Sequence, residues 1–202
     1  FENMIRKSFE FIIISAIPMC FLVIILSKEI ILVLAGKDYF PAIPMLQFLM
    51  PSLIFIGLSS VTAWQLLIPL GKEKYTVIGA LAGVIVNLGL NSLMIPAWGG
   101  VGAAIASTLA ELAVLSVHLK ALKEIVSRTF EKRELLIAIL STFITSGVVL
   151  VVKYNILVKA AFFACVVYGS VFVGVYGVSL LLFKEKLANE TLERLKAMVI
   201  RR

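Results

Sequence analysis

The chain has 202 residues, of which 61% are hydrophobic and only 15% are charged, and its mean hydropathy is +1.06. In soluble domains roughly a quarter of all residues are charged, so this composition excludes an ordinary soluble protein and places the chain in lipid. The net charge of +7 comes without a nucleic-acid motif or a basic patch interleaved with aromatic residues, so we expect no nucleic-acid partner.

Six stretches of the chain are long and almost free of charge, which predicts an all-α integral membrane bundle of six transmembrane helices. A hydrocarbon core about 30 Å thick requires roughly 20 apolar residues in each spanning helix. The first stretch is short, and it extends through residues 30–34 if Lys28 and Glu29 lie at the membrane surface. The predicted spans are residues 11–26, 44–70, 75–95, 100–122, 135–152 and 158–183.

Lysine and arginine gather on one side of the membrane when the six spans are drawn in order. The side that receives both ends of the chain carries 15 of the 19 basic residues, and the other side carries 4. Because basic loops are retained in the cytoplasm, we expect a multi-pass protein of the cytoplasmic membrane with both ends cytoplasmic. The tail, residues 184–202, has apolar residues at helical spacing, which is typical of either an amphipathic surface helix or a solvated helix end.

The second span is interrupted by proline and carries few polar side chains. Pro44, Pro51 and Pro69 lie along it, and proline in a membrane helix produces a simple kink or a hinge. Gln65 lies in the half of this span that we expect near the cytoplasm. It is a candidate cavity-lining residue.

The third span carries small and amide residues four positions apart, namely Gly79, Gly83, Asn87 and Asn91. This spacing forms one continuous seam along a helix. The two glycines allow a neighbouring helix to approach closely, and the asparagines either bond across the contact or line a polar path. A similar seam of small residues on the next span predicts close pairing of the two helices; it consists of Gly102, Ala106 and Ala110.

Glu111 is the residue that costs the most free energy to place in the predicted membrane region. It lies eleven residues after Gly100, which places it about 16 Å along the helix and near the bilayer centre. An ionised carboxylate there costs on the order of 3 kcal/mol, so Glu111 is either a proton, cation or substrate site or a protonated group bonded to a neighbouring helix. We expect one polar stripe facing the protein interior, with His118 as an interfacial residue at its end; it consists of Ser107, Thr108, Glu111 and His118.

No pattern in the sequence points to an enzyme, a cofactor or a metal site. There is a single histidine, no HExxH, no GxSxG and no phosphate-binding GxxxxGK motif. Cys20 and Cys165 both lie inside predicted spans, where a thiol usually behaves as a small apolar group, so we expect no disulfide.

Residues 31–122 contain three segments whose order is distinctive although each alone is a weak signal. They read ILVLAGKDYFPAIPMLQFLMPSLIFIGLS, then QLLIPLGKEKY, then GVIVNLGLNSLMIPAWGGVGAAIASTLAE. This order resembles the C-terminal half of bacterial polysaccharide exporters, the lipid-linked oligosaccharide flippases of the multidrug/oligosaccharidyl-lipid/polysaccharide (MOP) exporter superfamily.

The resemblance implies a transporter with two pseudosymmetric lobes that works by alternating access. It divides the chain into four helices of the C-terminal lobe in residues 1–122, two trailing helices in residues 123–183 and a cytoplasmic tail in residues 184–202. The implied cargo is an undecaprenyl-diphosphate-linked oligosaccharide for cell-surface polysaccharide synthesis. The residues expected to face the cavity between the lobes are Gln65, Asn87, Asn91 and Glu111.

This chain departs from that expectation in its cations. No Lys or Arg lies deep in any predicted span, so the cations that bind a diphosphate must come from the N-terminal lobe outside this chain. Lys72 and Lys74 contribute only at the cytoplasmic mouth. Glu111 is the candidate for coupling transport to a proton or sodium gradient.

Two other functions are also compatible with these residues. The related multidrug branch of the superfamily exchanges drugs for cations, and a membrane scaffold for glycan synthesis needs no transport at all. The partners expected for an oligosaccharide flippase are membrane lipid, the lipid-linked oligosaccharide and the N-terminal lobe of the same protein. Glycosyltransferases and a polysaccharide polymerase are further candidate partners.

Overall fold

The computed structural model describes residues 2–129, 131–183 and 185, and the predicted amphipathic tail therefore lies outside the described residues except for Glu185. The described part is built from helices without a strand, as the composition predicts. In chain order these are α1 (Glu2–Ile25), α2 (Ser27–Leu34), a 3-10 helix (Lys37–Ala42), α3 (Ile43–Leu49), α4 (Ser52–Thr62), a π-helical turn (Ala63–Leu67), α5 (Lys74–Trp98), α6 (Gly100–Ala121), α7 (Lys123–Thr129), α8 (Lys132–Asn155) and α9 (Ala161–Leu182).

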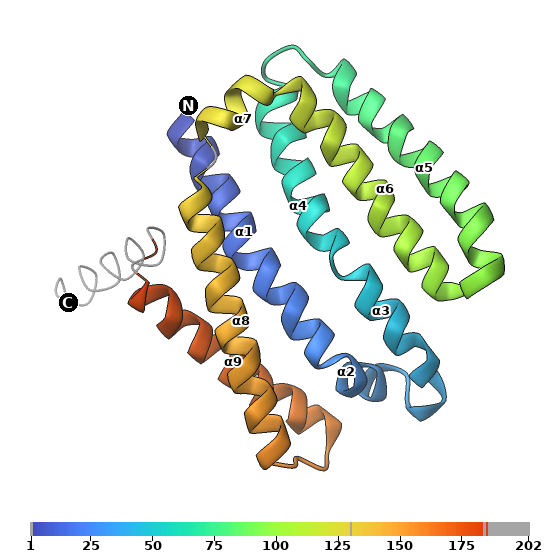
Figure 1. Cartoon of the computed structure of the whole chain (residues 1–202), viewed down its shortest axis with the longest axis vertical. Helices are drawn as coiled ribbons and strands as arrows, with labels where there is room; N and C mark the ends of the chain where they lie inside the picture. The colour runs from blue at the N-terminus through green and yellow to red at the C-terminus, as the bar shows by residue number, and fades with distance from the viewer. Residues whose placement is uncertain (1, 130, 184, 186–202) are drawn as a thin grey trace.

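Five of the described helices are long and apolar enough to cross a membrane, namely α1, α5, α6, α8 and α9. A sixth span is formed if the bent pair Lys37–Leu49 and Ser52–Leu67 counts as one crossing. On that count the number of predicted spans agrees with the structure. Figure 1 shows α1, α4, α6 and α5 lying next to one another, with α5 at one edge and α8 packed beside α1.

The first span begins much earlier than the predicted residue 11, because charged residues near its start are paired inside the fold. Arg6 Nη1 donates to Glu131 Oε1 at 3.0 Å, and Arg6 Nε lies 3.7 Å from Glu10 Oε1. These contacts allow α1 to begin at Glu2. The apolar residues 30–34 do not continue the same helix, since α1 ends at Ile25 and the separate helix α2 begins at Ser27.

The second span, predicted over residues 44–70 and interrupted by proline, is a broken helix rather than a helix with a simple kink. Its two halves are bent by 41° around Pro51, which cannot donate a backbone hydrogen bond. Ser52 Oγ donates to the Leu49 carbonyl at 2.6 Å and so satisfies one acceptor at the break. Beyond α4 the chain forms a π-helical turn, a widened geometry that rotates the following side chains around the helix axis.

Helices α5 and α6 form a closely packed antiparallel pair, as the two seams of small residues predicted (Figure 1). Gly99, with φ of 55°, reverses the chain between them. Beyond this turn Gly102 packs so closely against the Met94 backbone that no side chain fits between them. Ala106 and Ala110 are also buried, so the small residues set the distance between the two helices.

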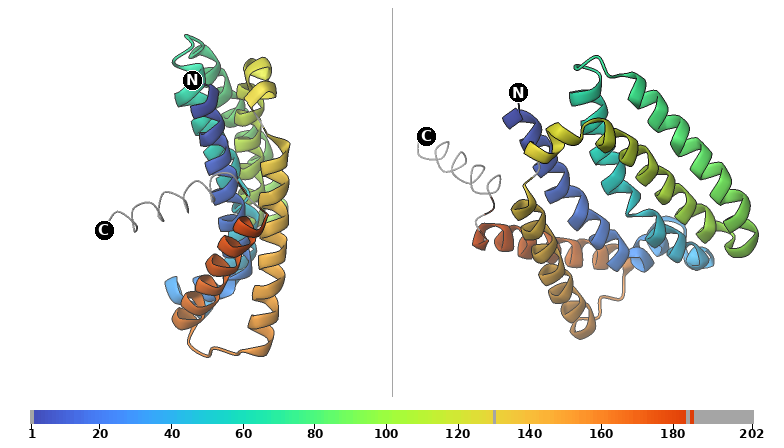
Figure 2. Two further views of the ribbon diagram at one scale, coloured as in Figure 1. Left: turned by 90° about the vertical axis from the view of Figure 1, so that its left-hand side faces the viewer. Right: turned by 45° about the horizontal axis from the view of Figure 1, so that its top comes forward.

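Helices α8 and α9 pack back onto the first part of the chain. Figure 2 shows α9 crossing α8 obliquely, and aromatic side chains of α9 such as Phe172 and Tyr176 are buried in the core between them. Lys153 Nζ of α8 donates to Glu29 at 2.9 Å and to the Ile25 carbonyl at 3.0 Å. This cation thus binds the end of α1 and the start of α2, where the negative end of the α1 dipole favours it.

Candidate functional site

A groove of about 640 Å³ lies between α5 and α6 near the middle of both helices. Small residues, among them Ala80, Gly83 and Ala110, form part of its lining. Packing of Gly83 is already tight, since a Cβ added there would lie 2.6 Å from Val114 Cγ2. The residues that line the groove are Ala80, Gly83, Val84, Asn87, Leu88, Ser107, Ala110, Glu111 and Val114.

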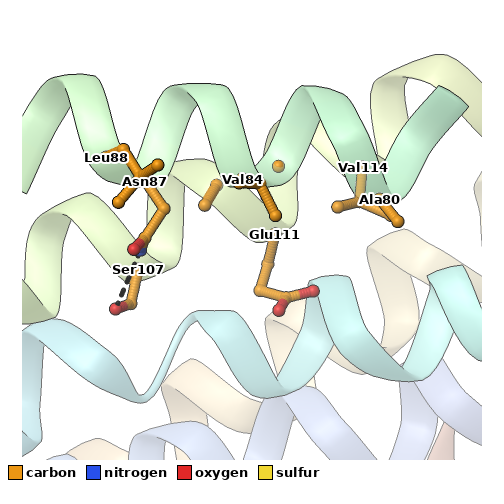
Figure 3. A pocket seen from close by; sticks show the side chains of 9 residues that line it. Ala80, Val84, Asn87, Leu88, Ser107, Glu111 and Val114 are labelled. Carbon is orange, nitrogen blue, oxygen red and sulfur yellow. Dashed lines mark hydrogen bonds between the residues drawn. The ribbon is translucent and has the colours of Figure 1, made fainter.

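Asn87, Asn91 and Ser107 form a chain of hydrogen bonds at one end of this groove. Asn91 Nδ2 donates to Asn87 Oδ1 at 2.8 Å, and Asn87 Nδ2 donates to Ser107 Oγ at 3.4 Å (Figure 3). The Asn91 Oδ1 atom is buried without a hydrogen-bond partner among the described residues. The asparagines therefore join the two helices through Ser107, and the buried Oδ1 of Asn91 stays without a partner among the described residues.

Glu111 lies about one helical turn beyond Ser107 in the same groove (Figure 3). Its side chain is half-buried and forms no hydrogen bond or ion pair with any residue in the part of the chain that the structure describes. A carboxylate in this position is able to bind a proton or a cation. It is also able to accept a hydrogen bond from a segment outside this chain. The structure thus places Asn87 and Glu111 in one groove, with Asn91 bonded to Asn87, and their exposure to a cavity between two lobes stays a prediction.

The predicted polar stripe of α6 does not face a single interior surface. Ser107 and Glu111 line the groove beside α5, whereas Thr108 Oγ1 donates to the Phe48 carbonyl of α3 at 2.8 Å. Residues spaced three and four apart share one face of an isolated helix. That face is broad enough here for two neighbouring elements to divide it between them.

His118 is not the interfacial residue that its position in the sequence suggested. Only 3% of it is exposed, and its Nδ1 lies 3.0 Å from Oγ1 of Thr62, which is fully buried. A Cβ added at Gly79 would lie 2.8 Å from His118 Nε2. The missing side chain at Gly79 therefore makes room for the imidazole between α5 and the end of α4.

Gln65 lies apart from the other predicted cavity residues. It is exposed on the π-helical turn and lines a different pocket, of about 430 Å³, together with Lys7 and Phe11 of α1. At the ends of the neighbouring helices, Lys72 Nζ donates to the Ala121 carbonyl at 3.5 Å, and Lys74 Nζ lies 5.3 Å from the centroid of the Tyr75 ring. Within the described structure, Gln65 therefore does not join the groove.

Two groups of buried polar residues were missed in the sequence. The first group consists of Glu10 and Glu134, which are 4% and 1% exposed. For Glu10, the sequence held one indication of an ion pair, since Arg6 lies four residues before it. The second group consists of hydroxyl side chains in the middle of α8, and Thr142 Oγ1 donates to the Ala138 carbonyl at 2.7 Å. Its members, all buried, are Ser141, Thr142, Thr145 and Ser146.

The groove offers carboxylate, amide and hydroxyl groups and no array of metal ligands. No cluster of three or more His, Cys, Asp or Glu side chains suited to a metal occurs among the residues that the structure describes. The chemistry available to the groove is therefore protonation, weak cation binding and hydrogen bonding to a polar group.

No family model and no curated protein sequence matches the chain. Among solved structures, the lipid II flippase MurJ in an inward closed conformation is similar, with a TM-score of 0.78 and 19% sequence identity. The match covers 95% of this chain and 40% of that chain. The chain therefore has the helical fold of that structure, which confirms the predicted all-α membrane bundle.

Proposed function

We propose that the chain is the C-terminal part of a flippase that moves an undecaprenyl-diphosphate-linked oligosaccharide across the cytoplasmic membrane by alternating access. The observation that carries this proposal is the fold, which matches the lipid II flippase over 95% of the chain. The order of motifs in residues 31–122 favours an oligosaccharide cargo for cell-surface polysaccharide. Because the chain spans 40% of the length of the similar structure, the whole transporter includes further helices under this proposal.

The proposed arrangement assigns residues 1–122 to the C-terminal lobe, residues 123–183 to two trailing helices and residues 184–202 to the cytoplasmic tail. Both ends of the chain are cytoplasmic in this arrangement, as the excess of basic residues on one side favours. The groove lined by Asn87 and Glu111, with Asn91 bonded to Asn87, faces the cavity shared with the N-terminal lobe. Lys72 and Lys74 lie at the cytoplasmic mouth, and diphosphate-binding cations deeper in the cavity come from the other lobe.

Transport is tested in proteoliposomes that contain the full-length protein and a fluorescent polyprenyl-diphosphate oligosaccharide. Uncatalysed passage of a glycan and a diphosphate through hydrocarbon is negligible, so protection of the label from an external quencher reports catalysed flipping. A lipid II analogue in parallel vesicles identifies the preferred cargo. Absence of flipping for both lipids, with the protein folded and inserted, contradicts the proposal.

Glu111 is the proposed coupling residue because its carboxylate lies in the groove without a described partner. In the full-length protein, Glu111→Gln should leave folding intact and abolish the dependence of flipping on a proton or sodium gradient. Initial flipping rates are measured with and without each gradient. The matched control is Glu73→Gln, which removes an exposed carboxylate at the start of α5 outside the groove. Unchanged gradient dependence in Glu111→Gln excludes the coupling role.

Drug or cation antiport and a non-transporting scaffold are the competing functions. A scaffold keeps its function when Asn87, Asn91 and Glu111 are all replaced by apolar residues, whereas a flippase loses transport. Neighbouring genes for glycosyltransferases and a polysaccharide polymerase favour glycan export over drug efflux, and their products are then the proposed partners.

A further inference from the structure

Another pocket, of about 300 Å³, lies beside the end of α6, and it shares no lining residue with the groove. Lysines enter it from two parts of the chain, because Lys72 belongs to the connection before α5 whereas Lys120 and Lys123 flank the end of α6. Its lining residues are Lys72, Lys120, Ala121, Leu122, Lys123, Glu124 and Ile125.

One of these lysines is held in place by the helix end itself. Lys72 is half-buried, and its Nζ donates to the Ala121 carbonyl, one of the terminal acceptors of α6, at 3.5 Å. The negative end of the helix dipole favours a cation at this position. The pocket also has an apolar component, since Leu122, only 1% exposed, and the half-buried Ile125 contribute to its lining.

The other two lysines are not neutralised by acidic neighbours. Lys120 and Lys123 are exposed and form no ion pair with any residue in ranges 2–129, 131–183 and 185. Glu124 is the acidic residue in the lining, so the three lysines leave an excess of two positive charges. Three ammonium groups around a small pocket with an apolar part suit a phosphate that is attached to an apolar chain.

We propose that this pocket binds the phosphate headgroup of a lipid at the membrane surface. It lies where a membrane-length helix, α6, ends, which is the level of the lipid headgroups. Basic pockets between transmembrane helices on the cytoplasmic side are suited to anionic headgroups. The inference rests on the orientation in the proposed function. The phosphate belongs either to an anionic phospholipid of the inner leaflet or to the polyprenyl diphosphate of the cargo.

Binding is measured by native mass spectrometry of the full-length protein in detergent. It is titrated with dioleoylphosphatidylglycerol, undecaprenyl diphosphate, zwitterionic dioleoylphosphatidylcholine and inorganic phosphate. The test variant is Lys120→Gln with Lys123→Gln, two exposed positions where folding is not at risk. The matched control is Arg128→Gln with Lys132→Gln, which removes two exposed charges nearby that do not line the pocket.

Loss of the two pocket lysines should weaken binding of the preferred anionic lipid about thirtyfold. The control variant should change the affinity for this lipid by less than about threefold. Lys120→Arg with Lys123→Arg, which keeps both charges, should keep the affinity of the unsubstituted protein. The lipid whose affinity falls identifies the source of the phosphate. Equal losses in the test and control variants, no loss in the test variant, or binding of inorganic phosphate as tight as that of the lipids overturns the proposal.

This measurement requires no transport. Lipid binding that depends on the pocket lysines in a protein that does not flip oligosaccharide supports the inference while contradicting the proposed function. An active flippase without such binding contradicts the inference alone.

Discussion

Glu111 and His118 occupy the same helix and the same predicted stripe, yet their surroundings in the structure differ. Glu111 lies in a groove of about 640 Å³ without a described partner, whereas His118 is 3% exposed and contacts Thr62. A buried imidazole with a hydroxyl neighbour acts as a structural link between α6 and the end of α4. A half-buried carboxylate beside a groove is available for function.

Replacing Thr62 by Val should destabilise the protein, because it leaves His118 Nδ1 buried without its hydroxyl partner while nearly preserving side-chain volume. We expect a loss of about 1 kcal/mol in the free energy of unfolding, the usual size of a hydrogen bond between membrane helices. Thermal unfolding of the full-length protein in detergent measures it.

Ser116→Ala serves as the control, because Ser116 is exposed and its Oγ donates to the Leu112 carbonyl within the same helix. If Thr62→Val and Ser116→Ala lower the unfolding temperature equally, the contact with His118 contributes nothing specific.

The pair α5 and α6 is the element on which the groove depends. Its small residues bring the two backbones together, and the asparagine seam then bonds to Ser107 across the contact. Because the groove lies along this contact, a change in the distance between the helices alters both stability and the shape of the groove. Helix packing and the shape of the groove are therefore linked in these two helices.

Gly83→Ala should separate α5 from α6, since the added Cβ would lie 2.6 Å from Val114 Cγ2. Overpacking of this kind destabilises by roughly 1–3 kcal/mol. The same substitution at Gly89, where an added Cβ meets nothing within 4 Å, should be neutral or stabilise α5 by up to about 1 kcal/mol.

Both variants are compared by thermal unfolding in detergent. Val114→Ala in the Gly83→Ala background should recover most of the lost stability. Failure of this second change to recover stability means that the contact with Val114 is not the cause.

Helix α8 is attached to the first part of the chain at both of its ends. Arg6 bonds Glu131 just before the start of α8, and Lys153 bonds Glu29 and the Ile25 carbonyl near its end. Between these ends Ala138 is fully buried against Ile13 and Ile17 of α1. The helices after residue 123 are therefore integrated into the packing of the preceding bundle.

At the scale of the whole molecule, the distribution of basic residues predicts the orientation in the membrane. This orientation is tested by introducing single cysteines into a Cys20→Ala, Cys165→Ala background and labelling them with a membrane-impermeant maleimide. Asp38→Cys should react in intact cells and Glu73→Cys only after the membrane is opened, since both positions are exposed in connections on opposite sides. The reverse pattern excludes cytoplasmic chain ends.

Sequence alone predicted the membrane class, the number of spans and the close pairing of α5 with α6, and its charge distribution predicts the orientation. These follow from hydropathy, charge counts and helical spacing, which are properties of neighbouring residues. The interruption of the second span was visible as proline, but the sequence did not distinguish a kink from a break bent by 41°.

Only the tertiary structure decided which helix meets each side of α6, so that Thr108 contacts α3, His118 contacts Thr62 and Glu111 lines the groove. It also separated Gln65 from that groove and paired Lys153 with Glu29. Helical spacing tells which residues share a face, but the neighbour of that face depends on contacts between distant parts of the chain. Those contacts arise only when all the helices pack together.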